Sequence, residues 1–194
     1  KQFNNKISNY KKLWLWSTKN PELFWNFLIE NFNIPITRKK SSKIINKKSN
    51  FWKTTFFEES HTNYYQLIFN NNSKNIAISF IGENGFEEKL SYETLNQRVN
   101  ALSNHFKSLK INKGDVVTGY LPNIPDTIIS FLAAAKIGAV WSSCSSDFGV
   151  QAVVDRFSQL KPKILIIANY YYYNGQKFNY SKQLPQLKKK LKNI

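Results

Sequence analysis

From residue 75 onward, short apolar runs alternate with amphipathic stretches along the chain. Short apolar runs between turn signals are typical of strands, whereas apolar positions three and four apart are typical of helices. In chain order, the pattern predicts strands at residues 76–81 and 87–91, a helix from Ser91 to about Leu109, a strand at 116–121, a helix at about 126–137, a strand at 139–142, a helix at 150–160 and a strand at 163–168. Strands and helices that alternate at this spacing predict crossover connections and an α/β fold with a parallel sheet.

Local signals support several of these elements. Asn84-Gly85 is a hairpin signal between the first two predicted strands. Ser91 is placed to cap the helix that follows, with Glu93 in its first turn, and Gly138 is placed to end the helix at 126–137. These signals predict a hairpin followed by strand-helix-strand crossover units.

The first third of the chain differs in composition and in its pattern of apolar and polar residues. Asn20, Pro21 and Glu22 predict the start of an amphipathic helix that runs to Phe32, with Asn20 as its cap. Residues 37–50 are rich in Lys, Ser and Asn with little periodicity, and this composition predicts a connecting segment. Residues 51–57 are too aromatic to be left in water, and we expect them to pack as an irregular strap over the next domain. A polar stretch at residues 70–73 places the domain boundary between residues 72 and 73.

The end of the chain combines aromatic and basic residues. Four tyrosines, Tyr170 to Tyr173, precede Asn174-Gly175, and this cluster predicts an aromatic turn. Residues 184–194 have the pattern of the beginning of a basic helix. No acidic residue follows Asp155, so the charge of this end is strongly positive.

Composition limits the protein class. With 42% hydrophobic residues in 194, the chain can bury a core, and the absence of Met predicts a fragment or trimmed chain. One Cys and two His allow no internal disulfide and no metal-ligand spacing. No apolar segment has the length of a membrane span, and no signal peptide is visible at the start. We expect a soluble, cytoplasmic protein with no membrane partner.

The net charge of +16 suggests a nucleic-acid partner, but the kind of basic residue argues against one. Only three of the 28 basic residues are arginine, the residue that reads bases and phosphates bidentately. Lys, Asn, Ile, Tyr and Phe are frequent throughout the chain. This abundance is typical of a proteome that is biased toward A/T-rich codons. Codon bias is therefore the favoured explanation, and nucleic acid is not an expected partner. Two alternative functions stay open. The chain could be a basic module that binds RNA, or a regulatory fragment that is stable on its own.

Some reactive side chains have ordinary structural interpretations. Cys144 has no histidine near it in sequence and is expected to be a buried, inert thiol. Trp141 is expected in the core at a strand end. Asp155 and Arg156 are expected to form a local salt bridge rather than to act in catalysis, and no catalytic residue is assigned.

Residues 138–157 carry the most informative pattern. Gly138 to Ser143 form an apolar strand-like run, Cys144 to Gly149 a small polar loop, and Val150 to Phe157 an amphipathic helix. Strand ends and helix N-termini present free backbone N–H groups, which makes this arrangement typical of a ligand site in α/β proteins.

These motifs resemble the adenylate-forming acyl-CoA synthetase superfamily. The resemblance rests on Leu90-Ser91-Tyr92, on Ala134-Ala135-Lys136-Ile137-Gly138-Ala139-Val140, and on the order in which they occur. Trp141 to Gln151, Asp155-Arg156-Phe157 and Lys161 to Leu165 are most similar to the acetoacetyl-CoA synthetase family. Acetyl- and propionyl-CoA synthetases share the layout and differ at residues 141–149.

The resemblance implies a truncated version of the family fold. Residues 1–72 would be a helical N-terminal cap, and residues 73–194 would begin the AMP-binding domain with its first crossover units. The intact protein would be a ligase that joins acetoacetate to coenzyme A (CoA), using ATP and Mg²⁺, through an acyl-adenylate. A ligase for acetate or propionate is the alternative.

The family's phosphate loop and catalytic lysine have no counterpart here, because the seven glycines never cluster into a phosphate cradle. The resemblance therefore implies that this piece is inactive alone, binds no cofactor tightly and needs the missing remainder of its own chain. What it retains is the CoA side. By resemblance, the CoA-side binding residues are Ser145, Asp147, Phe148, Gly149 and Lys177, and no residue is assigned to a metal. Ser146 stands where family members usually have proline.

Overall fold

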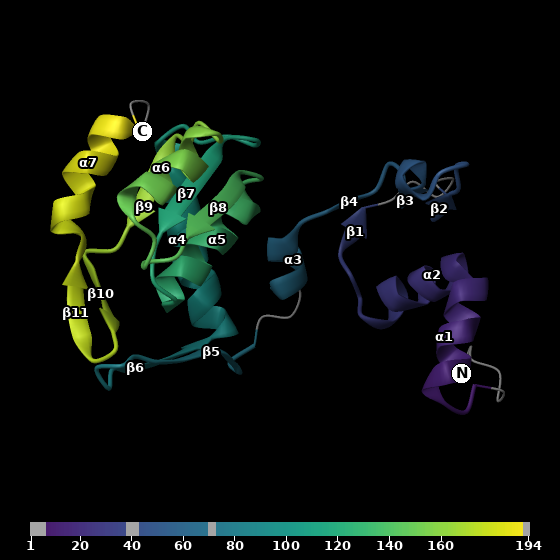
Figure 1. The fold of residues 1–194 in the computed structure, drawn as a ribbon. Coiled ribbons are helices and arrows are strands. Elements are labelled where there is room, and N and C mark those ends of the chain that lie inside the picture. Colours follow the sequence, from purple (N-terminus) through teal and green to yellow (C-terminus); the bar gives the residue numbers. More distant parts are fainter. Residues whose placement is uncertain (1–6, 38–42, 70–72, 192–194) are drawn as a thin grey trace. The chain divides into compact units, whose positions relative to one another are not determined.

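The structure, a computed structural model, describes residues 7–37, 43–69 and 73–191 (Figure 1). The chain divides into two units, residues 1–63 and residues 64–194. The predicted boundary between residues 72 and 73 concerns the AMP-binding domain of the family, and it stays a prediction. Residues 70–72 of the polar stretch on which it rests lie outside the described residues.

The first unit contains a pair of helices followed by short strand pairs. Its helices are α1 (Tyr10–Lys19) and α2 (Pro21–Asn31), and its strand pairs join β1 (Ile36–Thr37) to β4 (His61–Thr62) and β2 (Ile45–Asn46) to β3 (Thr55–Phe56). The helix predicted from Pro21 is confirmed, but Asn20 does not cap it through its side chain, which donates instead to the Trp16 carbonyl at 3.1 Å. Helix α1 was not predicted from the sequence.

The aromatic strap is exposed within its own unit. Phe51 and Trp52 keep 80% and 79% of their surface exposed, in a single 3₁₀ turn (Phe51–Lys53). Contacts inside the first unit therefore do not bury these rings, and their packing on the second unit stays a prediction.

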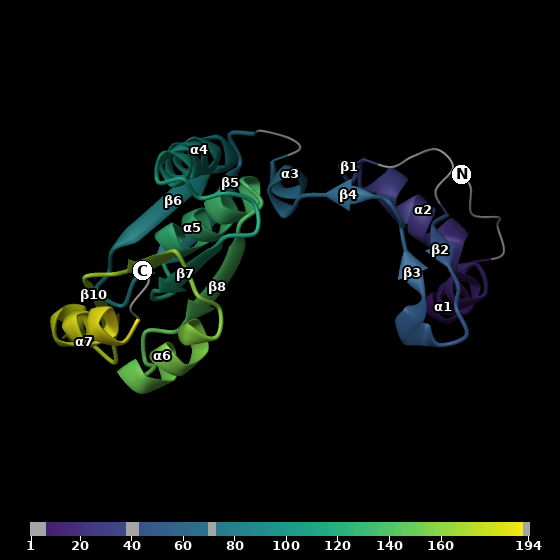
Figure 2. The same cartoon turned by 90° about the horizontal axis from the view of Figure 1, so that it is seen from above.

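The second unit is built on a parallel sheet. Strand β7 (Val116–Tyr120) lies between β8 (Val140–Cys144) and β9 (Ile164–Ile167), and it is parallel to both. Helices α5 (Pro125–Lys136) and α6 (Val150–Ser158) make the crossovers, as the alternating pattern predicts. Figure 2 shows the two helices on opposite sides of the sheet.

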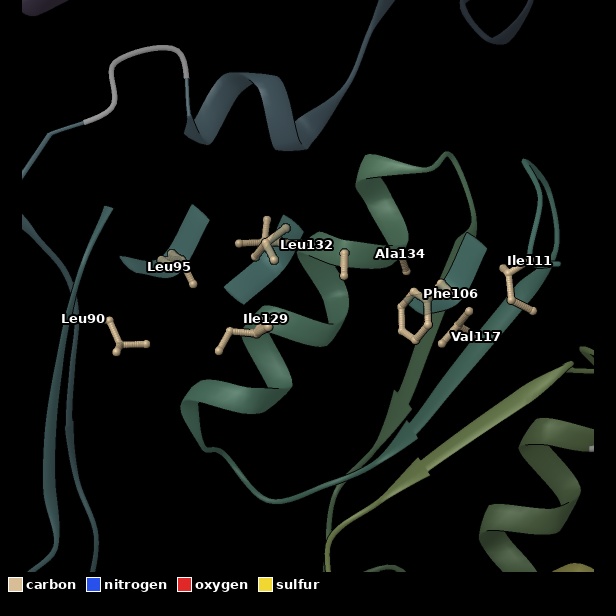
Figure 3. Close-up of a cluster of buried hydrophobic side chains, with 10 residues drawn as sticks. Leu90, Leu95, Phe106, Ile111, Val117, Ile129, Leu132 and Ala134 are labelled. Carbon is tan, nitrogen blue, oxygen red and sulfur yellow. The ribbon is translucent and has the colours of Figure 1, made fainter. Parts of the chain in front are cut away.

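One core lies between the sheet and the helices α4 (Tyr92–Ser108) and α5. It contains Leu90, Leu95, Phe106, Val117, Ile129 and Leu132, which come from strand, hairpin and helix alike (Figure 3). The hairpin is formed by β5 (Ile76–Ile81) and β6 (Glu87–Ser91), with the predicted bounds. The Ser91 hydroxyl accepts the Thr94 N–H at 3.1 Å, so the predicted cap of α4 is confirmed.

Helix α3 (Tyr64–Ile68) belongs to this unit because of its contacts with α4 and α5. The Tyr65 hydroxyl donates to the Asn96 side chain at 2.7 Å, and the Tyr64 ring lies 5.5 Å from that of Phe131. No helix of the described ranges is long and apolar enough to cross a membrane.

A second core lies on the other side of the sheet, under α6 and α7 (Gln183–Lys190). The predicted aromatic turn is a hairpin, formed by β10 (Tyr170–Tyr173) and β11 (Gln176–Asn179) around Asn174-Gly175. Both turn residues have positive φ, 50° and 72°, which is why Asn and Gly occupy them. The predicted basic helix is α7, and residues 192–194 of that prediction lie outside the described residues.

Candidate functional site

The order of the strands identifies one place at the carboxyl edge of the sheet. The chain passes from β7 to β8 on one side and then returns across β7 to β9 on the other. The loops that follow β7 and β9 therefore diverge to opposite faces. A crevice forms at such a reversal, and ligands of open parallel sheets bind there.

The structure has a cavity of about 740 Å³ at this position. Its walls come from the tip of the β5–β6 hairpin within residues 80–88, from the loop at residues 121–126 after β7, and from residues 166–172 at the end of β9 and in β10. The Gly175 N–H donates to Glu83 Oε2 at 3.0 Å and so joins the tips of the two hairpins. We call this cavity the switch-point crevice.

The crevice is apolar and carries only acidic charge. Its lining contains no Lys, Arg or His among the described residues, while Glu83, Glu88 and Asp126 contribute carboxyl groups. Glu88 is already paired with Arg98 at 2.7 Å, and Glu83 accepts the Gly175 N–H. Asp126 lies in the first turn of α5, where a negative charge is favourable. A phosphate inside the crevice would face these carboxylates.

The loop of residues 145–149 lies at the carboxyl end of β8, as predicted. Ser145 and Asp147 are exposed, while Ser146 is buried. The Tyr120 hydroxyl donates to the Ser146 carbonyl at 3.2 Å and to the Phe148 carbonyl at 2.5 Å. One buried side chain of the central strand therefore bonds to two carbonyls of the loop.

Helix α6 begins directly after this loop with uncapped N–H groups. Gly149 is its N-cap residue and makes no side-chain hydrogen bond, and the first turn contains no acid. A Cβ added to Gly149 would meet nothing within 4 Å, so there is open space beside this residue. This end of the helix is suited to a negatively charged group.

Phe148 is held by Arg156, whose guanidinium lies 4.8 Å from the ring centroid. The predicted salt bridge between Asp155 and Arg156 is wrong. Asp155 instead accepts the Gln151 side-chain amide at 2.6 Å, because side chains four apart on a helix are neighbours, whereas adjacent ones diverge.

An aromatic cluster lies under the loop and connects it to the β10–β11 hairpin. The Tyr120 ring lies 4.7 Å from that of Tyr180, and Tyr171 lies 5.4 Å from Tyr180 and 5.2 Å from Phe178. Burial raises the pKa of Tyr120 to about 12. Burial also raises the pKa of Tyr180, an effect that the Ser146 side chain partly offsets. Both phenols therefore stay protonated at neutral pH.

Lys177 lies on the other face of that hairpin. It pairs with Tyr172 across the strands, whereas Tyr171 pairs with Phe178, and adjacent pairs face opposite ways. The Lys177 ammonium lies 3.9 Å from the Tyr170 ring centroid, and Tyr170 lines the crevice. The structure thus separates Lys177 from the loop at 145–149 and places it beside the switch-point crevice.

Cys144 is buried at the end of β8, and burial raises the pKa of its thiol, with Arg156 lowering it by less. A buried thiol with a raised pKa is unreactive, in agreement with the sequence prediction. Within the described ranges, no group of three or more His, Cys, Asp or Glu is placed to hold a metal ion.

The sequence did not predict the crevice. It predicted the β5–β6 hairpin, β7 and β9, but it predicted an aromatic turn where β10 supplies part of the wall. The walls of the crevice come from three stretches separated by about 30 to 40 residues, and only the strand order brings them together. The available signal was the Pro122–Pro125 loop directly after a buried strand.

Comparison with known proteins points to one group. Residues 69–194 match the family described as AMP-binding enzyme. The chain is 32% identical over 190 residues to the acetoacetyl-CoA synthetase of Macaca fascicularis and 31% identical over 176 residues to the acetoacetyl-coenzyme A synthetase of Rhizobium meliloti (strain 1021). These alignments cover 97% and 91% of this chain, and 28% and 27% of the relatives.

A solved structure agrees with the sequence relatives. The acetoacetyl-CoA synthetase from Streptomyces lividans superposes with a TM-score of 0.87 at 26% identity, over 96% of this chain and 29% of that one. The chain thus spans under a third of the length of the relatives it matches.

Proposed function

This chain belongs to the AMP-binding enzyme family, and on that premise we propose that it forms the CoA side of an acid-thiol ligase that makes acetoacetyl-CoA. The observation that carries the proposal is the identity of about 30% to acetoacetyl-CoA synthetases along more than nine-tenths of this chain. We further propose that residues 1–72 are the family's N-terminal cap region, that residues 73–194 begin the AMP-binding domain, and that the ligase works in the cytoplasm.

The proposed reaction has two steps. A carboxylate oxygen of acetoacetate attacks the α-phosphorus of ATP, forming an acyl-adenylate and releasing pyrophosphate. The CoA thiolate then attacks the acyl carbon, a C–S bond forms, the C–O bond to AMP breaks, and AMP leaves.

The first step needs groups that neutralise phosphate charge. The residues of this chain do not fit Mg²⁺-ATP, because its glycines form no phosphate cradle and the described residues hold no metal-binding cluster. No part of the adenylation step is therefore assigned to these residues.

The second step needs CoA to be held, and two features at the carboxyl edge of the sheet support that role. The loop of Ser145, Asp147, Phe148 and Gly149 opens onto the uncapped N-terminus of α6. Lys177 provides an exposed positive charge beside the switch-point crevice. We assign these five residues to CoA binding, with the loop on the nucleotide side.

A chimera tests the proposed ligase activity. The 194 residues replace the matched 29% of the Streptomyces lividans enzyme, and the product is assayed with acetoacetate, ATP, Mg²⁺ and CoA. The proposal predicts acetoacetyl-CoA formation by the chimera and none by the 194-residue chain alone. A folded chimera that uses acetate or propionate in preference to acetoacetate would favour the alternative ligases. A folded chimera without any acyl-CoA synthetase activity would refute the proposal.

A further inference from the structure

A cavity of about 640 Å³ lies within the first unit, away from the carboxyl edge of the sheet. One wall is formed by residues 19–23, where α1 ends and α2 begins. The other wall comes from residues between 43 and 47, which include β2. We call it the lysine cavity, because of the side chains that give it its charge.

Three ammonium groups gather at this cavity without a counter-charge of their own. Lys19, Lys43 and Lys47 line it, and Glu22 is the only acid among the described lining residues. None of the three lysines makes a side-chain hydrogen bond or an ion pair with the described part of the chain. The lining therefore has a formal charge of +2. Like charges repel, so an anion bound between the lysines is favoured.

The start of α2 adds to the positive potential of the lysines. Asn20 makes no side-chain cap, so the N–H groups of Glu22 and Leu23 have no acceptor within the helix. Both residues line the cavity. The Glu22 carboxylate lies in the same first turn and opposes a second anion there. The lysines therefore supply the attraction, and Glu22 reduces it.

The lining favours a phosphate group over other anions. Lysine binds phosphate as a point charge, and a phosphate dianion matches the formal charge of +2, which a monoanion such as acetate does not. The described lining contains no aromatic ring and no Arg, so a nucleic-acid base finds no stacking partner. Leu23 and Ile45 add apolar surface beside the charged groups. The cavity exceeds the size of a phosphate group and leaves room for a small organic portion.

We infer that the lysine cavity binds the phosphate group of a small phosphorylated molecule that carries no nucleotide base. Lys19, Lys43 and Lys47 would hold the phosphate, and the apolar wall would contact the rest of the molecule. The inference goes beyond the proposed function and does not rest on it, because CoA binding is assigned to the second unit.

The test titrates the 194-residue chain with inorganic phosphate and follows the backbone amides by NMR. We expect saturable shifts of amides within residues 19–23 and 43–47. Acetate, the monoanionic probe, is expected to bind the same amides several-fold more weakly. Higher ionic strength should weaken both, since the lysines are exposed to solvent.

Two pairs of variants separate this cavity from general attraction to a basic surface. Lys47→Gln is expected to weaken phosphate by about 3-fold. Lys48→Gln makes the same charge change at an exposed neighbour outside the lining and is expected to have no effect. Glu22→Gln is expected to tighten phosphate by about 2-fold to 3-fold. Its control is Glu30→Gln, at an exposed position of α2 outside the lining, which should leave the affinity unchanged.

Three results would overturn the inference. The first is phosphate that shifts only amides of the second unit, or that shifts none saturably. The second is equal weakening by Lys47→Gln and Lys48→Gln, because the attraction would then come from the whole basic surface. The third is acetate that binds as tightly as phosphate. Circular dichroism of each variant confirms that it is folded.

Discussion

Removal of one hydroxyl, by Tyr120→Phe, tests how the central strand holds the loop at residues 145–149. The Tyr120 side chain is 1% exposed, and its hydroxyl donates to the carbonyls of Ser146 and Phe148 at 3.2 and 2.5 Å. The phenylalanine ring keeps the same contact with the aromatic cluster. The substitution therefore removes hydrogen bonds without opening a large cavity.

The expected loss of stability is about 2 kcal/mol, because a net hydrogen bond contributes about 1 kcal/mol and a carbonyl left buried without a donor costs more. In a chain of this size, 2 kcal/mol lowers the melting temperature by about 4 to 8 °C. Urea unfolding followed by tyrosine and tryptophan fluorescence measures the difference. CoA affinity is expected to fall too, since the loop loses its anchor.

Tyr180→Phe is the matched control. Tyr180 is 2% exposed and lies in the same cluster, but its hydroxyl makes no hydrogen bond of good geometry within the described residues. Its removal is expected to leave stability unchanged or to raise it. Equal destabilisation by both variants would refute the argument, because the effect would then come from the phenol and not from the bonds to the loop.

Three further predictions concern other parts of the second unit. Gly119→Ala is expected to cost about 1 to 3 kcal/mol in urea unfolding, because the added Cβ would lie 2.6 Å from the Trp141 ring, and an unchanged midpoint would contradict this. Ser91→Ala removes the cap of α4 and is expected to cost about 1 kcal/mol, and Ser91→Gly less; an equal or larger loss in the Gly variant would contradict the capping role. The hydrogen bond from Lys163, and then the backbone of Asn112, hold the pKa of Asp115 below its usual value. Asp115 therefore adds stability above its unfolded pKa of about 4, and this is lost as pH falls through the lower folded value. Asp115→Asn should reduce the acid dependence of the melting temperature, and an identical pH profile would contradict this assignment.

The sequence predicted elements well where the signals are local. Asn84-Gly85 and Ser91 determine a hairpin turn and a helix start through a few neighbouring residues, and both lie as expected. The β10–β11 hairpin was missed because four consecutive tyrosines show no alternation between an inner and an outer face. Asn174-Gly175 was the signal that could have revealed it.

The site was harder to predict because it depends on how distant segments assemble. The loop at 145–149 is contiguous, so its place at a strand end followed from the pattern alone. The switch-point crevice requires β9 to lie beside β7 and opposite β8, which no periodicity indicates. The position of Lys177 likewise depends on the register of a hairpin that the sequence reading did not predict.

Hydrogen exchange of the 194-residue chain with and without CoA tests most directly whether the carboxyl edge of the parallel sheet binds this substrate. The account predicts slower exchange in residues 145–151 and 121–126 and in the β10–β11 hairpin, with α4 and the first unit unchanged. Protection confined to the first unit, or no change at saturating CoA, would contradict it.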